Sequence, residues 1–272
     1  MRSNRFTTDV ADIFDDALDR ADGPVYVVNP RGRMISRLLD RLREVDASVL
    51  VRLLADDGPL KDVLDDFLIA SHAADLIAAE RLSIRVLEDT TNDSLLVSDR
   101  AVRALVAGDE RTAALSTDDD AFVADIQSKC ADAWDEAAAF SLRTPPLSRV
   151  RETLTEEIGP DSAADFDAML DHLDEVTGNG DSLDEVTVSI LAAANNGVLL
   201  YDIGKWGEDV GMASKATFSR TKTQLEDLGI IKTEKVPIDV GRPRLRLTFG
   251  EDRYREADPA SLVDLARADL HE

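Results

Sequence analysis

The lysines of this chain are concentrated in one segment, which suggests that the segment contacts a polyanion. Five of the seven lysines lie between residues 205 and 235, although the whole chain carries a net charge of −24. The stretch 197–250 holds nine Lys or Arg and seven Asp or Glu, so it reverses the acidic balance found elsewhere. Cations gathered on one short segment are typical of a surface that meets nucleic-acid phosphates. We therefore expect double-stranded DNA as a partner.

Residues 212–228 have the side chains that a helix needs to enter the major groove. Ser214 suits the N-cap of a helix, and Phe218, Leu225 and Leu228 repeat at helical spacing, which predicts a buried face. The side chains predicted to face outward are small enough for close approach, polar enough for base edges or basic enough for phosphates. They are Lys215, Ala216, Thr217, Ser219, Arg220, Lys222 and Thr223.

A basic hairpin is predicted to follow this helix. Residues 230–236 and 244–249 form its two strands, and its tip contains the sequence Gly241-Arg242-Pro243-Arg244. In many prokaryotic regulators such a wing places an arginine against the backbone or in the minor groove. Our candidate DNA-binding residues are therefore Ser214, Lys215, Thr217, Ser219, Arg220, Lys222, Thr223, Arg242 and Arg244. The alternative is a non-catalytic adaptor that uses the same surface for protein contacts.

Further elements must position this surface. We predict a helix from a cap at Ser182 to Asn196, a short strand at 198–200, and a second helix at 201–209 that buries Ile203 and Trp206. Gly229 suits the left-handed position that ends the recognition helix. This order of elements predicts a winged helix-turn-helix domain at 178–250. A helical connector at 144–177 precedes it, and an acidic, helical tail at 251–272 follows it.

The first half of the chain predicts an α/β domain at 1–143. Apolar strands at 25–28, 48–54 and 82–87 alternate with amphipathic helices at 5–21, 33–44 and 60–79. After residue 87 we expect an antiparallel pair at 94–98 and 101–106, a short strand at 112–116, and a long helix from 119 to 140. The expected fold is thus a mixed sheet with helices on both faces.

Few residues of this domain suggest a ligand or a metal. Arg31, Arg33 and Arg52 lie at or near strand ends, where α/β sheets bind ligands, so they are candidates for a phosphorylated sugar. They fit solvated surface arginines equally well. Cys130 is the only cysteine, which excludes an intramolecular disulfide and a cysteine-based zinc site. We expect neither a cofactor nor a metal.

No membrane association is expected from the sequence. The N-terminus lacks the apolar region of a signal peptide, and no stretch reaches the ~18 consecutive apolar residues that a membrane span requires. These observations predict a cytoplasmic protein.

The pattern from 82 to 140 resembles the phospholipase-D-like sensor domain of TrmB-type regulators. Active members of the phospholipase D superfamily carry the motif His-x-Lys-x4-Asp, and that register falls on Asn92, Ser94 and Asp99 here. The nucleophilic histidine and the phosphate-holding lysine are both absent, so the resemblance implies a degenerate, non-catalytic domain. The competing hypothesis of a phosphodiesterase or nuclease is disfavoured for the same reason.

The whole arrangement resembles the TbsP-type regulators of haloarchaea, which are associated with control of central carbohydrate metabolism. The acidic, lysine-poor composition resembles the proteins of salt-accumulating haloarchaea. The resemblance implies a sequence-specific DNA-binding transcription regulator whose N-terminal domain senses a small metabolite or mediates assembly. The long helix at 119–140, the connector helices and the habit of winged helices to read two half-sites predict a homodimer. We also expect specific DNA binding to survive molar KCl, because at ~1 M salt only near-contact charges act.

Overall fold

The protein consists of two compact units, residues 1–142 and 143–272. The computed structural model describes residues 5–7, 11–45, 49–87, 93–107, 112–176, 183–237 and 243–270. Each unit has its own core.

The first unit is built on a mixed sheet, which in the described residues has the strand order β1-β7-β6-β5-β2-β3-β4-β8. Its strands β2 (Val25–Val28), β3 (Val51–Ala55) and β4 (Leu82–Val86) are parallel. The strands β5 (Ser94–Val97), β6 (Val102–Ala107), β7 (Thr112–Thr117) and β1 (Arg5–Thr7) extend it in antiparallel pairing. At the other edge β8 (Ala138–Ala139) pairs antiparallel with β4.

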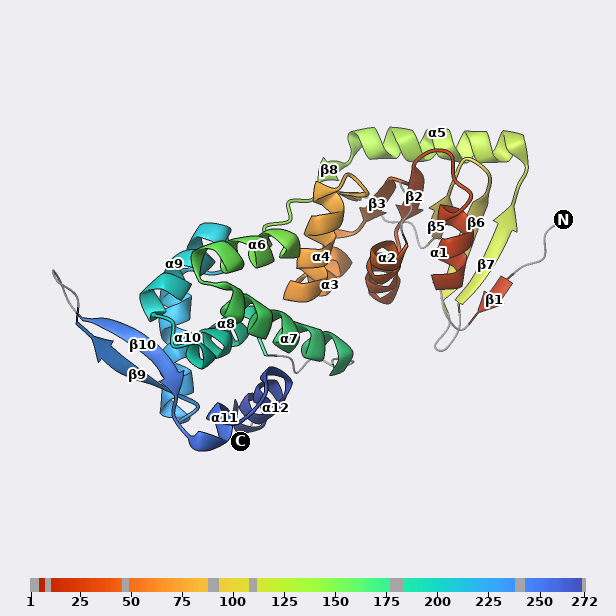
Figure 1. Cartoon of the computed structure of the whole chain (residues 1–272). Helices are drawn as coiled ribbons and strands as arrows, with labels where there is room; N and C mark the ends of the chain where they lie inside the picture. The colour runs from red at the N-terminus through yellow and green to blue at the C-terminus, as the bar shows by residue number, and fades with distance from the viewer. Residues whose placement is uncertain are drawn as a thin grey trace. The chain divides into compact units, whose positions relative to one another are not determined.

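Helices cover both faces of this sheet (Figure 1). One face packs against α1 (Ala11–Leu18), α2 (Gly32–Glu44), α3 (Asp57–Leu64) and α4 (Phe67–Ala78). The other face packs against α5 (Asp120–Glu136). Neighbouring strand residues point to opposite faces, so Leu53 joins the core under α1–α4 while Leu54 joins the core that contains Trp134. The predicted fold class, an α/β domain followed by a helix-turn-helix domain, is confirmed.

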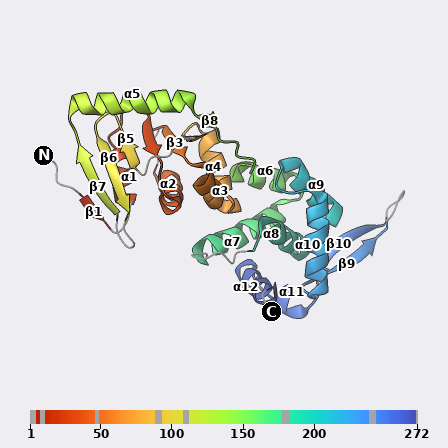
Figure 2. The ribbon, with the colours of Figure 1, turned by 180° about the vertical axis from the view of Figure 1, so that it is seen from behind.

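The second unit contains the helix-turn-helix elements and the helices on either side of them in sequence. The flanking helices are α6 (Leu147–Glu157), α7 (Pro160–Val176), α11 (Asp252–Arg255) and α12 (Pro259–Leu270). Between them lie α8 (Glu185–Asn195), α9 (Leu200–Val210), α10 (Lys215–Asp227), β9 (Ile231–Val236) and β10 (Arg244–Phe249). Figure 2 shows α10 beside the β9–β10 hairpin, with which it is in contact.

The helices predicted as a connector and a tail pack into this second unit. Trp206 of α9 is 1% exposed, lies edge-on to Phe166 of α7 at 6.4 Å, and donates from Nε1 to Thr153 Oγ1 of α6 at 3.0 Å. Helix α12 packs against α7, and Asp264 lies 3.1 Å from His172. These helices pack together because they bury apolar side chains. Their residues Leu154, Leu173 and Leu262 are all at most 2% exposed. In the described residues, α6, α7 and α12 therefore pack together with the helix-turn-helix elements in one compact unit.

Several elements differ from the sequence predictions. The predicted helix at 5–21 begins as strand β1 and is helical only at α1, and the predicted helix at 60–79 is divided into α3 and α4. The predicted cap Ser182 lies outside the described residues, and α8 begins instead after Asp184, whose carboxylate accepts from Thr187 N at 2.6 Å. The predicted strand at 198–200 is only an isolated bridge between Leu199 and Arg246. The long helix ends at Glu136 instead of Phe140, because the chain turns to pair with β4, where Phe140 N donates to Ile84 O at 3.0 Å.

Candidate nucleic-acid interface

Helix α10 is set in place by a cap, two left-handed glycines and two core anchors. The Ser214 side chain accepts from Thr217 N, as the sequence predicted for the helix start. Gly211 ends α9 at φ +87°, and Gly229 follows α10 at φ +74°, a region that favours glycine. Phe218 and Leu225 are buried, which fixes one face of α10 against the unit and leaves the opposite face in solvent.

The outward face of α10 carries most of the predicted DNA-binding side chains. Ser214, Lys215, Ser219, Arg220 and Thr223 are exposed, and Thr217 is half-buried. Thr217 Oγ1 lies 3.0 Å from Ser214 Oγ, and Thr223 Oγ1 donates to Ser219 O at 3.0 Å. Arg220 has no salt bridge to any residue in the described part of the chain, so its guanidinium is available to an external acceptor.

Lys222 does not face outward, which corrects the sequence prediction. Its side chain is only 13% exposed, and its Nζ lies 2.6 Å from Glu226 Oε2, one helical turn further on. Glu226 Oε1 in turn accepts from Thr233 Oγ1 of β9 at 2.6 Å. These contacts hold the pKa of Glu226 below its usual value, although burial opposes the shift. Glu226 therefore ties α10 to the hairpin, and Lys222 holds the Glu226 carboxylate from within the same helix.

Leu228 is also placed differently from the prediction. It is 41% exposed, because α10 ends at Asp227 and Leu228 is its C-cap. Ile230, which follows the left-handed Gly229, is fully buried and fills the core position instead.

The hairpin forms as predicted, with the antiparallel register running from Arg244 opposite Val236 to Phe249 opposite Ile231. Arg242 lies outside the described residues. Arg244 is held by α9, because its Cζ is 3.9 Å from the centre of the Tyr201 ring and its Nη1 is 2.9 Å from Asp202 Oδ1. On the strands, Lys235 and Arg246 are exposed.

Tyr201 was not identified from the sequence. It is 49% exposed at the start of α9, and it lines a groove of about 380 Å³ together with Lys215, Ser219, Arg244 and Leu245. The groove lies between α9, α10 and β10, next to the outward face of α10. Its basic side chains and the nearby amino terminus of α9 suit a phosphate of the DNA backbone. The sequence offered one signal that could have identified Tyr201. It is an aromatic residue at a predicted helix start, in a chain with few aromatic residues.

Acidic neighbours already partner several of the clustered lysines. Lys215 pairs with Glu208, and this hydrogen bond raises the pKa of Lys215 and lowers that of Glu208. Lys205 pairs with Asp209 on the same helix, with the same two effects. A DNA phosphate at this surface would have to compete with carboxylates for Lys205 and Lys215. This competition would weaken non-specific attraction more than contacts from Arg220, which has no salt bridge to the described residues.

The three arginines proposed as effector ligands have separate surroundings. Arg52 packs under α5, where its Nη1 donates to Tyr26 Oη at 2.7 Å and its Cζ lies 5.4 Å from the centre of the Trp134 ring. Arg31 and Arg33 are exposed at the start of α2, and Arg31 lines a small pocket of about 120 Å³ that also contains Asp93 and Ser94. The contacts of Arg52 give it a structural role.

At the described positions of the phospholipase-D register, both side chains are hydrogen-bonded to backbone groups. Ser94 Oγ donates to Asn29 O at 2.7 Å, and Asp99 Oδ1 accepts from Asp22 N at 3.3 Å, while Asn92 lies outside the described residues. Among the described residues, no group of three or more His, Cys, Asp or Glu side chains is placed to hold a metal ion. No helix in the described part of the chain is long and apolar enough to cross a membrane.

Two family models together match nearly the whole chain. Residues 2–145 match the N-terminal domain of the TbsP-like transcriptional regulators, and residues 146–267 match the C-terminal HTH domain of the same regulators. No curated protein matches the sequence.

Two solved structures show weak similarity to about half of the chain. One is TrmBL2, an archaeal chromatin protein with a novel mode of DNA binding, at a TM-score of 0.37 and 14% identity over 52% of this chain and 55% of that one. The other is Nuc, a phospholipase D family member from Salmonella typhimurium, at a TM-score of 0.37 and 11% identity over 51% of this chain and 97% of that one. Similarity this low supports no conclusion about function.

Proposed function

The chain belongs to the TbsP-like transcriptional regulators, and we propose that it recognises specific promoter sequences with the outward face of α10 and the β9–β10 wing. The observation that carries this proposal is the exposed row on α10, in which Arg220 lacks an ion pair to the described residues while Ser219 and Thr223 lie beside it. Small hydroxylated side chains around an unpaired arginine allow close approach to base edges.

We assign different roles to the two sides of this surface. Arg220, Ser219, Thr217 and Thr223 would face the bases, since they lie on the exposed side of α10. Lys215, Arg244 and Tyr201 would hold a backbone phosphate at the adjoining groove, where Arg244 is already oriented by the Tyr201 ring. Arg242, which lies outside the described residues, is proposed from its sequence position between the two hairpin strands to add a backbone or minor-groove contact.

We further propose that the protein acts in a haloarchaeon on genes of carbohydrate metabolism. The resemblance to the TbsP-type regulators supports both parts of this proposal. The composition supports the haloarchaeal source, since acidic residues outnumber basic ones 55 to 31. The test is capture and sequencing of genomic fragments with the full-length protein in 0.1 M and in about 2 M KCl, where screening confines charge effects to a few ångströms. We expect the same promoter fragments to be enriched at both concentrations. Enrichment that disappears in the higher salt, or random recovery at both, would contradict the proposal.

A homodimer would let the protein read two half-sites. Self-association is supported by three exposed apolar side chains of the first unit, two of them on the sheet face that α5 covers, since Val106, Leu115 and Phe122 are 54%, 47% and 48% exposed. Val106 lies on this face because it alternates with Val102 and Ala104, and Leu115 pairs opposite Ala104. Light scattering should give twice the chain mass, and Phe122→Glu should reduce it. A single-chain mass for the unaltered protein would exclude the dimer.

We infer that the first unit senses a metabolite without catalysing a reaction on it. The absence of histidine and lysine from the phospholipase-D register supports this, because Asn92 and Ser94 stand where that motif has its histidine nucleophile and its phosphate-holding lysine. The adaptor alternative, in which the same surface binds protein, predicts that no fragment is enriched in the capture experiment.

A further inference from the structure

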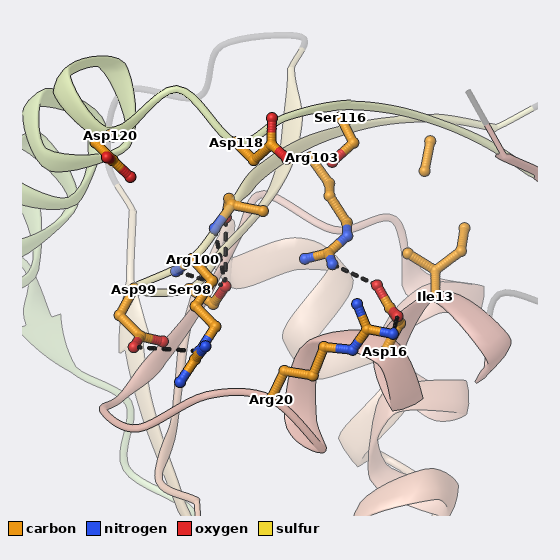
Figure 3. A pocket seen from close by; sticks show the side chains of 12 residues that line it. Ile13, Asp16, Arg20, Ser98, Asp99, Arg100, Arg103, Ser116, Asp118 and Asp120 are labelled. Carbon is orange, nitrogen blue, oxygen red and sulfur yellow. Dashed lines mark hydrogen bonds and ion pairs between the residues drawn. The ribbon is translucent and has the colours of Figure 1, made fainter. Parts of the chain in front are cut away.

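The first unit contains a polar pocket of about 690 Å³ at one end of the sheet (Figure 3). The turn between β5 and β6 borders it with Ser98, Asp99 and Arg100, while α1 contributes Asp16 and the turn after α1 contributes Arg20. The pocket lies just beyond the last residue of β5, whereas Ser94 of the phospholipase-D register is the first residue of that strand. The pocket therefore contains Asp99, the last residue of the phospholipase-D register, whereas Ser94 of the same register lies at the other end of β5.

A buried arginine with an unused donor lines this pocket. Arg103 is only 8% exposed, and its Nη2 donates to Asp16 Oδ2 at 2.6 Å. Its Nη1 has no hydrogen-bond partner among the described residues. Figure 3 shows this nitrogen on the side away from Asp16, directed toward the Ser98–Arg100 turn. A buried charged group with an unmet hydrogen bond costs about 1–3 kcal/mol or more, so its persistence calls for a compensating acceptor.

Arg103 occupies a core-facing position of β6, where burying a charge costs free energy. It lies on the α1 face of β6, where the next residue on that face is the buried Leu105 and the neighbouring strand supplies the buried Ala114. An apolar side chain at this position would complete the core without burying a charge. A core arginine that is only partly paired is a typical feature of a binding site.

The charges around Arg103 indicate the chemical class of the ligand. Arg20 and Arg100 flank it with side chains 49% and 58% exposed, and both pair with aspartates, Arg20 with Asp16 and Arg100 with Asp22. Asp99, Asp118 and Asp120 add carboxylates to the lining. These carboxylates would repel a highly charged anion but accept hydrogen bonds from hydroxyl groups. A volume near 690 Å³ suits a small metabolite.

We propose that this pocket binds a small hydroxylated anion, with its carboxylate or phosphate at the guanidinium of Arg103, whose hydrogen-bonding capacity is incompletely used, and its hydroxyls on the surrounding aspartates. This rests on the proposed sensing role of the first unit and specifies its location and ligand class. It replaces Arg31, Arg33 and Arg52 as the centre of the effector site.

The test is calorimetric titration of the full-length protein, without DNA and at fixed KCl, with four probes. Glycerate and glycerol 3-phosphate distinguish a carboxylate from a phosphate ligand, inorganic phosphate tests the bare anion, and glycerol tests hydroxyls alone. We expect saturable binding of at least one hydroxylated anion and none of glycerol. The proposal would be overturned if glycerol bound as tightly as the anions. It would also be overturned if neither hydroxylated anion showed saturable binding up to 10 mM, which is roughly 30-fold above a Kd of about 0.3 mM.

Three variants locate the binding site. Arg103→Lys keeps the charge beside Asp16 but removes the second terminal nitrogen, so affinity should fall at least about tenfold. Arg20→Ala changes a half-exposed side chain at the same pocket, so it should also weaken binding without threatening the fold. Arg33→Ala is the matched control and should leave affinity unchanged. If both Arg103→Lys and Arg20→Ala bound the ligand as tightly as the unaltered protein, the location would be refuted. A loss of affinity in Arg33→Ala alone would refute it as well. DNA capture by the same proteins reports separately on the proposed regulator function.

Discussion

Replacement of Trp206 by alanine is expected to cost about 3–5 kcal/mol of the unfolding free energy of the second unit. The indole is 1% exposed and joins three helices, since it belongs to α9, packs edge-on to Phe166 of α7 and donates to Thr153 of α6. Its loss removes the buried ring and leaves Thr153 Oγ1 without that donor. Because α9 supports α10, DNA binding should fall with the folded fraction.

The measurement is denaturant unfolding followed by far-ultraviolet circular dichroism, with Tyr201→Ala as the control. Tyr201 lies on the same helix but is 49% exposed, so its replacement should change stability by roughly 0.5 kcal/mol or less. A Trp206→Ala protein within about 1 kcal/mol of the unaltered protein would show that α6 and α7 do not contribute to the helix-turn-helix core.

The Gly207→Ala variant is expected to lose about 1–3 kcal/mol through overpacking between α9 and α10. A β-carbon on Gly207 would fall well inside contact distance of Phe218 Cε2 and Cζ. The Phe218 ring is itself 1% exposed and cannot move into solvent without opening the core. Helix α10 would therefore shift relative to α9, and the groove at Lys215 and Arg244 would change shape.

Gly204→Ala is the matched control, because it lies one turn earlier on the same helix and faces the same ring. Its β-carbon would lie 3.6 Å from Phe218 Cβ, an ordinary contact. Alanine also favours a helix interior over glycine by roughly 1 kcal/mol, so Gly204→Ala should be neutral or stabilising. Thermal unfolding and DNA affinity should both separate the two variants. Similar behaviour of the pair would mean that the close packing of Gly207 on Phe218 does not position α10.

Local signals made much of the second unit predictable from sequence. Ser214 caps α10, Gly229 takes the left-handed conformation, and the two hairpin strands begin and end within a residue of their expected limits. Each of these features depends on a few neighbouring residues, such as a hydroxyl three positions before an amide or a missing β-carbon. They can therefore be recognised without knowledge of distant contacts.

Contacts between distant residues explain what the sequence did not predict. Lys222 was expected outside because helical spacing alone cannot show that Glu226 binds both Lys222 and Thr233 of another element. Arg103 contacts Asp16, 87 positions earlier, and Arg52 contacts Tyr26, 26 positions earlier, so neither role was visible locally. The helices at 144–176 and 259–270 appeared separable for the same reason, because their apolar faces meet partners far along the chain.

The most direct test of DNA recognition by the outward face of α10 is an equilibrium binding isotherm on a captured promoter fragment. Arg220→Ala removes an exposed arginine that forms no salt bridge to the described residues, whereas Arg149→Ala removes an arginine that is also exposed, from α6 of the same unit. We predict that Arg220→Ala weakens binding at least about tenfold, the range expected for a base-contacting arginine, while Arg149→Ala stays within about twofold and both fold normally. Equal affinities for the two folded variants would contradict DNA recognition by this face of α10.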